Sequence, residues 1–150
     1  IQELKSVLAK YLPKGPAQFP EDQLSTQPVR FMVSEIIREK LFLHLREEVP
    51  YYTAVDIEKW DEDEKNGMTT IYATIYVTRP SHKAMIIGRG GSMIKQIGSE
   101  ARQNILKLVD GKVRLELWVK VRDHWTEDTD FLHELEMNRL GGLIENGDGK

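Results

Sequence analysis

The segment Ile86-Ile87-Gly88-Arg89-Gly90-Gly91, followed by Ser92-Met93-Ile94-Lys95, decides the fold of this chain. Three glycines within four positions interrupt an otherwise helix-forming run. Because glycine lacks a Cβ atom, the main chain can turn sharply there and a ligand can approach it closely. The segment therefore predicts a tight turn between two helices, with its backbone accessible to a partner.

Helices are predicted on both sides of this turn. Pro80 and Ser81 open the first, in which Lys83 to Ile87 is long enough for one or two turns. After Gly91, apolar residues recur at spacings of three and four over about 17 residues. These positions are Met93, Ile94, Ile97, Ala101, Ile105 and Leu108. Gly111 lies just past the end of the second helix, where a left-handed cap is expected.

Alternating apolar and polar residues predict three strands, over 51–60, 70–78 and 113–121. An acidic stretch, 61–67, separates the first two strands and ends in Asn-Gly, which is typical of a hairpin loop. A further helix runs from Pro28 to Glu48 without a breaker, and Pro50 ends it. The predicted order is α-β-β-α-α-β, an α+β fold with a three-stranded sheet covered on one face by helices.

The flanking segments predict a division into three parts. Residues 1–27 are expected to be the end of a helix from a preceding domain plus a Pro/Gly-rich linker, and residues 28–122 the folded domain. Residues 123–150 form an acidic tail, with a weak helix over 127–140 and a glycine-rich end expected to be disordered. The chain starts at Ile1 with no signal-like segment, so we expect a processed or truncated chain.

Composition excludes several classes of protein. No apolar run approaches the roughly 18 to 20 residues that span a bilayer. The absence of cysteine removes disulfides and thiolate metal sites, and fits a reducing compartment.

The charge is unevenly distributed, although the net value is only −3. Residues 79–122 carry 10 Lys and Arg against 3 Asp and Glu, whereas residues 56–78 carry 2 against 6 and residues 123–150 carry 2 against 8. The basic block contains the glycine segment, and such asymmetry indicates a polyanion site. On charge alone, a solvated helix face is the simpler explanation.

A Gly-x-x-Gly turn before a helix has a direct use in binding phosphate. The first N–H groups of the helix have no intrahelical partners, and the helix dipole adds partial positive charge. Arg89 would donate to a phosphate, Lys83 and Lys95 would add charge, and isoleucines would border a groove for unstacked bases. The predicted RNA-binding residues are Lys83, Ile86, Ile87, Gly88, Arg89, Gly90, Gly91, Ser92, Ile94, Lys95 and Ile97.

Other phosphate-binding loops do not fit this spacing. A Walker loop needs Gly-x4-Gly-Lys-Ser/Thr, and Gly91 to Lys95 does not match it. A dinucleotide fingerprint needs a strand running into Gly88 and a small residue at position 93, which is Met.

The sequence predicts neither a catalytic site nor a metal site. The four histidines, His44, His82, His124 and His133, lie at no ligand spacing. The cluster 61–64 is best explained as a solvated loop, and Ser92 and Ser99 have no activating base.

Tyr72, Tyr76 and Trp118 fall on the polar faces of their strands, and Trp60 could join them. Such a surface could stack bases. It lies opposite the helices, however, so rim packing or a protein-docking surface is favoured over base stacking.

The segment Ile86–Ile97 resembles the C-terminal KH domain of the Era family of GTPases. The similarity extends to Gly98–Arg102, Leu115–Val121, Arg38–Lys40 and Arg46–Pro50, while Leu12–Pro16 and Pro20–Leu24 resemble the family's link from the GTPase domain. It covers about residues 1–140, and residues 138–150 run past the usual family end. The resemblance implies a type II KH fold. It also implies binding to single-stranded RNA near the 3′ end of 16S-type ribosomal RNA, in small-subunit assembly.

The resemblance implies that this chain is not an enzyme, because the GTPase motifs are absent. GTP and Mg are then expected only for the missing GTPase domain. The implied partners are ribosomal RNA, the small ribosomal subunit, the GTPase domain of the same protein and, through the parent, a membrane periphery; no DNA is expected. The implied location is the bacterial cytoplasm, or an organelle matrix or stroma in a eukaryote. The alternative is a KH-fold protein-interaction or tethering domain without RNA function.

Overall fold

The computed structural model describes residues 2–12, 15 and 28–144 of the chain. Its elements in order are α1 (Gln2–Tyr11), α2 (Val29–His44), the 3-10 turn η1 (Val49–Tyr52), β1 (Thr53–Asp63), β2 (Met68–Val77), α3 (Pro80–Ile87), the 3-10 turn η2 (Arg89–Gly91), α4 (Ser92–Ile105), β3 (Lys112–Val121) and α5 (Thr129–Ile144). The predicted α-β-β-α-α-β order of the domain is confirmed. The predicted linker lies almost entirely outside the described residues, as do residues 145–150.

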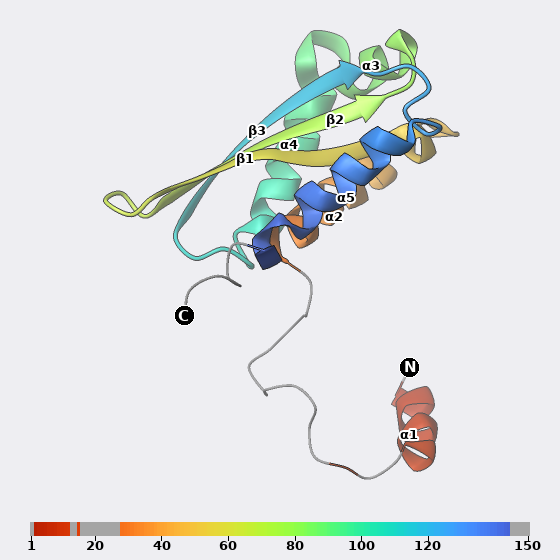
Figure 1. Ribbon diagram of the computed structural model, residues 1–150, viewed down its shortest axis with the longest axis vertical. Coiled ribbons are helices and arrows are strands. Elements are labelled where there is room, and N and C mark those ends of the chain that lie inside the picture. The colour runs from red at the N-terminus through yellow and green to blue at the C-terminus, as the bar shows by residue number, and fades with distance from the viewer. Residues whose placement is uncertain (1, 13–14, 16–27, 145–150) are drawn as a thin grey trace.

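The three strands form one mixed sheet in the order β1-β2-β3 (Figure 1). Strands β1 and β2 are antiparallel and are joined by the turn at 64–67, whereas β2 and β3 are parallel. Parallel neighbours need a crossover connection, and here it consists of α3, the glycine turn and α4. The glycine segment is therefore part of the link between two paired strands.

The main core lies between one face of the sheet and helices α2, α3 and α4. Its buried apolar side chains are Val33, Ile37, Leu41, Leu45, Val49, Val55, Ile57, Ile71, Ala73, Ile75, Val77, Ile86, Ile97, Ala101, Ile105, Val113 and Val119. The helical members recur at spacings of three and four and the strand members at spacings of two, as amphipathic elements require. The prediction of a sheet covered on one face by helices is confirmed for this layer.

A β-bulge in β1 changes which side chains reach the core. Ile57 pairs with Ala73 but Lys59 pairs with Tyr72, so Glu58 is an extra residue. The alternation shifts by one position after the bulge. Trp60 therefore packs against the main core. The suggestion that Trp60 joins the exposed aromatic face is wrong for this reason.

Helix α5 makes a second, smaller core. Trp125, Phe131 and Leu135 are buried together with Ala54 of β1, and Tyr76 of β2 packs against them. Ala54 and Tyr76 are register partners on the sheet face opposite the main core. Figure 1 shows α5 beside α2 and β1, and it contacts both. Part of the sheet's second face is thus also covered, and the helix continues past the predicted end at 140.

The ends of two other helices differ from the predictions. Helix α2 stops at His44 rather than near Glu48, because the backbone of Leu45 is extended, with φ −94° and ψ 153°. Helix α4 stops at Ile105 and continues as a turn through 106–108. In α1, the large apolar side chains Leu4, Val7, Leu8 and Tyr11 are exposed. Among the described residues, no helix is long and apolar enough to cross a bilayer.

Candidate nucleic-acid interface

The turn between α3 and α4 consists of glycines in conformations that other residues avoid. Gly88 has φ +70° and ψ 176°, and its N–H donates to the carbonyl of Ala84 at 2.9 Å, which ends α3. Gly90 and Gly91 are left-handed, with φ of +59° and +77°. No side chain caps α4, whose N-cap is Gly91, so no side-chain oxygen occupies the positive end of that helix.

The glycines of the turn have different steric roles. A Cβ at Gly88 would lie 2.7 Å from the Cβ of Met93 and 2.9 Å from its backbone nitrogen. Gly88 therefore allows α4 to start close against the end of α3. A Cβ at Gly90 or Gly91 would meet nothing within 4 Å. These two positions leave the backbone open to a ligand.

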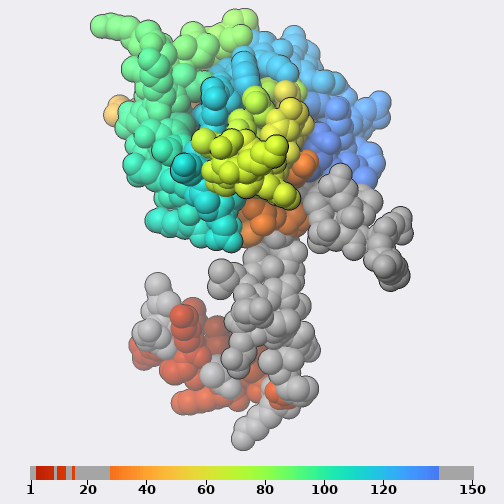
Figure 2. Space-filling view, turned by 90° about the vertical axis from the view of Figure 1, so that its left-hand side faces the viewer, coloured from red at the N-terminus to blue at the C-terminus, as the bar shows by residue number. Residues whose placement is uncertain are grey.

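The turn projects from the body of the domain. In Figure 2 the segment from α3 to the start of α4, coloured green, stands out at the upper left. Arg89, Gly90 and Ser92 are exposed, and Gly88, Gly91 and Ile87 are partly exposed. A phosphate could therefore reach the main chain and Arg89 together.

Among the described residues, the cations from α3 to just past the end of α4 have no carboxylate partners. Within the described part of the chain, no Asp or Glu oxygen lies within ion-pair distance of Lys83, Arg89, Lys95, Arg102 or Lys107. Glu100 is the acidic residue of α4, and its carboxylate is bonded to His44 Nε2 at 2.7 Å. On the sheet, by contrast, Lys59, Arg114 and Lys120 each pair with an acidic side chain. The positive potential for phosphate is therefore concentrated on α3, the turn and α4.

A groove of about 390 Å³ runs beside the turn, between α4 and β3. Its lining residues are Ile94, Lys95, Gly98, Ser99 and Arg102 of α4, and Leu115 and Leu117 of β3. A Cβ at Gly98 would lie 3.3 Å from Leu117 Cδ1, so the groove depends on this glycine for its width. An apolar wall facing hydroxyl, ammonium and guanidinium donors suits an unstacked base with its phosphate outside.

Two of the four isoleucines predicted to border the groove are fully buried. Ile86 and Ile97 are 0% exposed and belong to the main core, because they lie on the faces of α3 and α4 that pack against the sheet. The prediction that they border the groove is wrong, and they instead support the turn from beneath. Ile94, one turn earlier than Gly98, is the predicted isoleucine that lines the groove.

The sequence-based prediction did not include five groove residues, namely Gly98, Ser99, Arg102, Leu115 and Leu117. Their spacing carried the signal. Positions 94, 98 and 102 are four apart and so share one face of a helix, and 115 and 117 share one face of a strand. What the sequence does not show is that this face of α4 lies beside this face of β3 in the folded domain.

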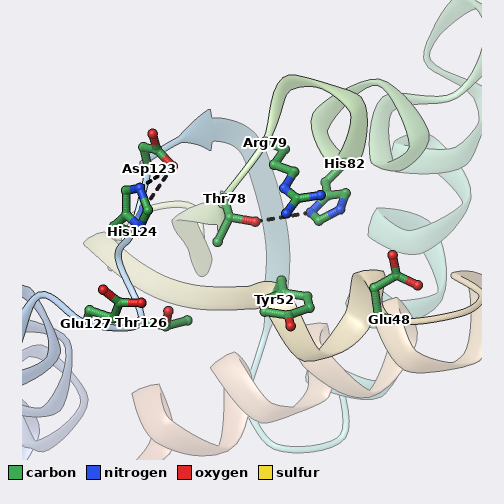
Figure 3. Close-up of a pocket in the computed structure, with 9 residues that line it drawn as sticks. All are labelled: Glu48, Tyr52, Thr78, Arg79, His82, Asp123, His124, Thr126 and Glu127. Carbon is green, nitrogen blue, oxygen red and sulfur yellow. Dashed lines mark hydrogen bonds and ion pairs between the residues drawn. The ribbon is translucent and has the colours of Figure 1, made fainter.

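A second cavity, of about 320 Å³, lies at the other end of α3 (Figure 3). Glu48, Asp123 and Glu127 contribute carboxylates to its lining, which disfavours phosphate. His82 is only 5% exposed, and its Nδ1 lies 3.3 Å from the Thr78 hydroxyl. His82 therefore belongs to this cavity and the core rather than to the turn.

Of the three aromatic residues predicted on the open face of the sheet, two stack on each other and the third packs against α5. Tyr72 and Trp118 stack with centroids 5.9 Å apart and planes at 16°. Tyr76 instead packs edge-on against Phe131 at 4.8 Å. No cluster of three or more His, Asp or Glu side chains able to hold a metal occurs among the described residues.

Comparison with known proteins identifies the class of domain. The profile of the KH domain family matches residues 48–126, which include β1, β2, the glycine turn and β3. The chain belongs to the KH domain family. Within it, the match is to the C-terminal KH domain of the Era GTPases, the non-catalytic part of those proteins.

Curated relatives support this placement at high identity. The chain is 66% identical over 135 residues to GTPase Era of Desulfovibrio desulfuricans, covering 90% of this chain and 44% of that protein. It is 50% identical over 135 residues to GTPase Era of Geobacter metallireducens, covering 90% and 45%. The chain thus spans less than half the length of these relatives.

Solved structures agree with the fold. A crystal structure of Aquifex aeolicus Era bound to GDP and aluminium fluoride superposes with a TM-score of 0.82 at 38% identity, over 89% of this chain and 45% of that one. A crystal structure of Era in complex with MgGDPNP and nucleotides 1506–1542 of 16S ribosomal RNA gives the same TM-score, identity and coverage.

Proposed function

We propose that this chain binds single-stranded RNA through the glycine turn and the adjacent groove. The target is the 3′ region of small-subunit ribosomal RNA. The Era structure that contains nucleotides 1506–1542 of 16S ribosomal RNA supports this choice of target. Gly88 to Gly91 would hold the phosphate backbone, Arg89, Lys83 and Lys95 would neutralise it, and the groove would hold bases.

The observation that carries the proposal is the coincidence of three features at one place. The uncapped helix N-terminus and the open glycine backbone lie next to the end of the groove that Ile94 forms. Lys95 and Arg102 line the groove itself and have no ion-pair partner among the described residues. Each alone has a structural explanation. Together they present a backbone-binding site and a base-binding site side by side.

The wider function follows from the same relatives. We propose that the chain works within an Era-like GTPase, whose missing domain would bind GTP and Mg and would be its partner in the same protein. The proposed setting is small-subunit assembly in the bacterial cytoplasm. Association with the membrane periphery would be a property of the parent protein.

The test is a titration with a short unstructured RNA at two salt concentrations. Binding should weaken at the higher salt, with a slope of about 0.7 per phosphate contacted. The double variant Arg89→Asp/Gly90→Asp should lose most of the affinity, because it places negative charge at the tip. Gly90 is exposed with free space around it, and Asp tolerates left-handed backbone, so the fold should persist.

A matched control changes the same charge in another turn. Lys65→Asp/Gly67→Asp replaces an exposed lysine and a left-handed glycine at the tip of the β1–β2 hairpin. Its RNA affinity should stay within about twofold of the unmodified chain once salt screening is present. Equal losses in both double variants would show a non-specific charge effect. Absence of binding at either salt would favour the tethering function.

A further inference from the structure

The open face of the sheet carries an assembled stack of one cation and two aromatic rings. Lys59 of β1 places Nζ 5.4 Å from the ring centroid of Tyr72 on β2, and Tyr72 stacks on Trp118 of β3. The three side chains therefore follow the strand order across the sheet. Lys59 is also paired with Asp61, which holds the cation in place.

Trp118 is at the end of this stack and has a free ring surface. Tyr72 covers one side of the indole, yet Trp118 is still 45% exposed. Strand β3 is the edge of the sheet, with β2 as its neighbour in the described structure. Because Tyr72 reaches the indole from β2, the indole face away from Tyr72 is the one left for a ligand.

The same edge strand is a wall of the proposed RNA groove. Leu115 and Leu117 line the groove on one face of β3, and Trp118 follows Leu117 directly on the other face. An RNA strand leaving the groove over the edge of β3 would meet the indole next. On this face Glu116 and Lys120 are the direct neighbours of Trp118, and Arg114 lies beyond Glu116 and pairs with it. The side chains of Arg114 and Lys120 are well exposed.

We propose that Trp118 stacks a base of the same RNA, outside the nucleotides held by the turn and the groove. The proposal rests on the proposed RNA-binding function and extends its site around the edge of β3. Base stacking on an aromatic side chain contributes to affinity without depending on base identity. Tyr72 already holds the indole, so little side-chain freedom is lost when a base binds.

The sheet face that carries Tyr72 and Trp118 would bind RNA differently from the glycine turn. Its cations are paired with Asp61, Glu116 and Glu58, so it adds little net positive charge. The contribution of Trp118 should therefore depend weakly on salt. This property separates stacking from the phosphate contacts of Lys95 and Arg89.

The experiment compares two RNA lengths with the Trp118→Ala variant of the full chain. A four-nucleotide RNA, the length that a KH turn and groove hold, should bind the variant and the unmodified chain equally. An RNA of about ten nucleotides should bind the variant about fivefold or more weakly, with an unchanged salt slope. Trp118→Phe should recover most of the affinity, because it retains a ring stacked on Tyr72.

A matched control is Tyr51→Ala, which removes another well-exposed aromatic side chain, one that packs on Phe42 of α2. It should bind both RNAs like the unmodified chain. If Trp118→Ala binds the longer RNA with unchanged affinity, the stacking role is overturned, and the face is left to protein docking. If the unmodified chain binds neither RNA, the RNA-binding function itself fails.

Discussion

Gly88 and Gly90 are two residues apart and have opposite reasons for lacking a side chain. Gly88 is required by packing, because the backbone of Met93 occupies the space where a Cβ would lie. Gly90 has empty space around it and a left-handed backbone that Asn or Asp also adopts. One glycine thus belongs to the fold and the other to the proposed ligand site.

We predict that Gly88→Ala destabilises the domain by about 1 to 3 kcal/mol, because it adds backbone strain and displaces Met93. Gly90→Asn should cost less than about 1 kcal/mol. Unfolding in urea measures both differences. Equal stability of the two variants would contradict the division of roles.

The phenol of Tyr76 gives a pH-dependent prediction. Burial, together with the charge and hydrogen bond of Glu58, raises the pKa of Tyr76 to about 12. Its hydroxyl donates to Glu58 Oε1 at 3.2 Å, and Lys120 Nζ donates to the same oxygen at 2.7 Å. The neutral phenol is therefore favoured in the folded chain. Its contribution to stability is complete below the unfolded pKa of about 10 and is lost as pH rises toward about 12.

Phenolate absorbance should accordingly show one tyrosine that ionises near pH 12, and Tyr76→Phe should remove that step. The same variant should lose less stability than the unmodified chain between about pH 10 and 12. Tyr51→Phe, at an exposed site, should retain the step. If the ionisation step near pH 12 disappears in the Tyr51→Phe variant instead, the assignment to Tyr76 is wrong.

Residue types alone identified the centre of the candidate site. Glycine spacing and flanking cations follow from chemistry that does not depend on tertiary structure, so Gly88 to Gly91, Arg89 and Lys95 were predictable. Whether an isoleucine faces RNA or the core depends on which side of its helix the sheet lies. Ile86 and Ile97 were therefore assigned to the groove, although they are buried against the sheet.

At the scale of elements, the groove exists because α4 and β3 approach each other at Gly98 without closing the space between them. Leu117 Cδ1 would lie 3.3 Å from a Cβ at that position. A leucine terminus can shift by a few tenths of an ångström. A small side chain could therefore be tolerated, but it would occupy part of the groove.

We predict that Gly98→Ala leaves the domain equally stable or up to about 1 kcal/mol more stable, since alanine favours a helix interior. RNA affinity should nevertheless fall, and Gly98→Leu should reduce it further. Thermal unfolding and RNA titration on the same samples would separate the two effects. Gln103→Leu, on an exposed position of the same helix, is the control that should leave affinity unchanged.

Element order was predictable because helix and strand periods differ strongly along this sequence. The bulge after Ile57 was not, because one inserted residue has no signature in an alternating segment. That insertion moved Trp60 to the core. Residues 115 and 117 were correctly placed on one face of β3, but the helix facing them follows only from the folded arrangement.

At the scale of the whole molecule, α5 and the turn before it pack against the sheet from the segment that the sequence analysis assigned to the tail. The sequence placed residues 123–150 outside the domain as an acidic tail. Acidic composition hid the spacing of Trp125, Phe131 and Leu135, whose burial depends on Ala54 and Tyr76 far back in the chain. The domain boundary at residue 122 stays a prediction that stability measurements can test.

We predict that Phe131→Ala destabilises the chain by about 3 kcal/mol, because it leaves a cavity between Tyr76 and Trp125. A chain that ends at residue 122 should be destabilised at least as much. Trp125→Phe should cost less, since among the described residues the buried Trp125 Nε1 has no hydrogen-bond partner to lose. If truncation leaves the denaturation midpoint unchanged, α5 is dispensable to the domain.

The crossover between β2 and β3 has a kinetic consequence. Parallel pairing of these strands requires the whole segment 78–111 to be closed into a loop first. The glycine turn lies inside that segment and should become ordered only after the sheet has assembled. In pulse-labelled hydrogen exchange during refolding, amides of α4 should thus gain protection no earlier than those of the β1–β2 hairpin. An RNA-binding surface that matures last would keep unfinished chains from occupying their target.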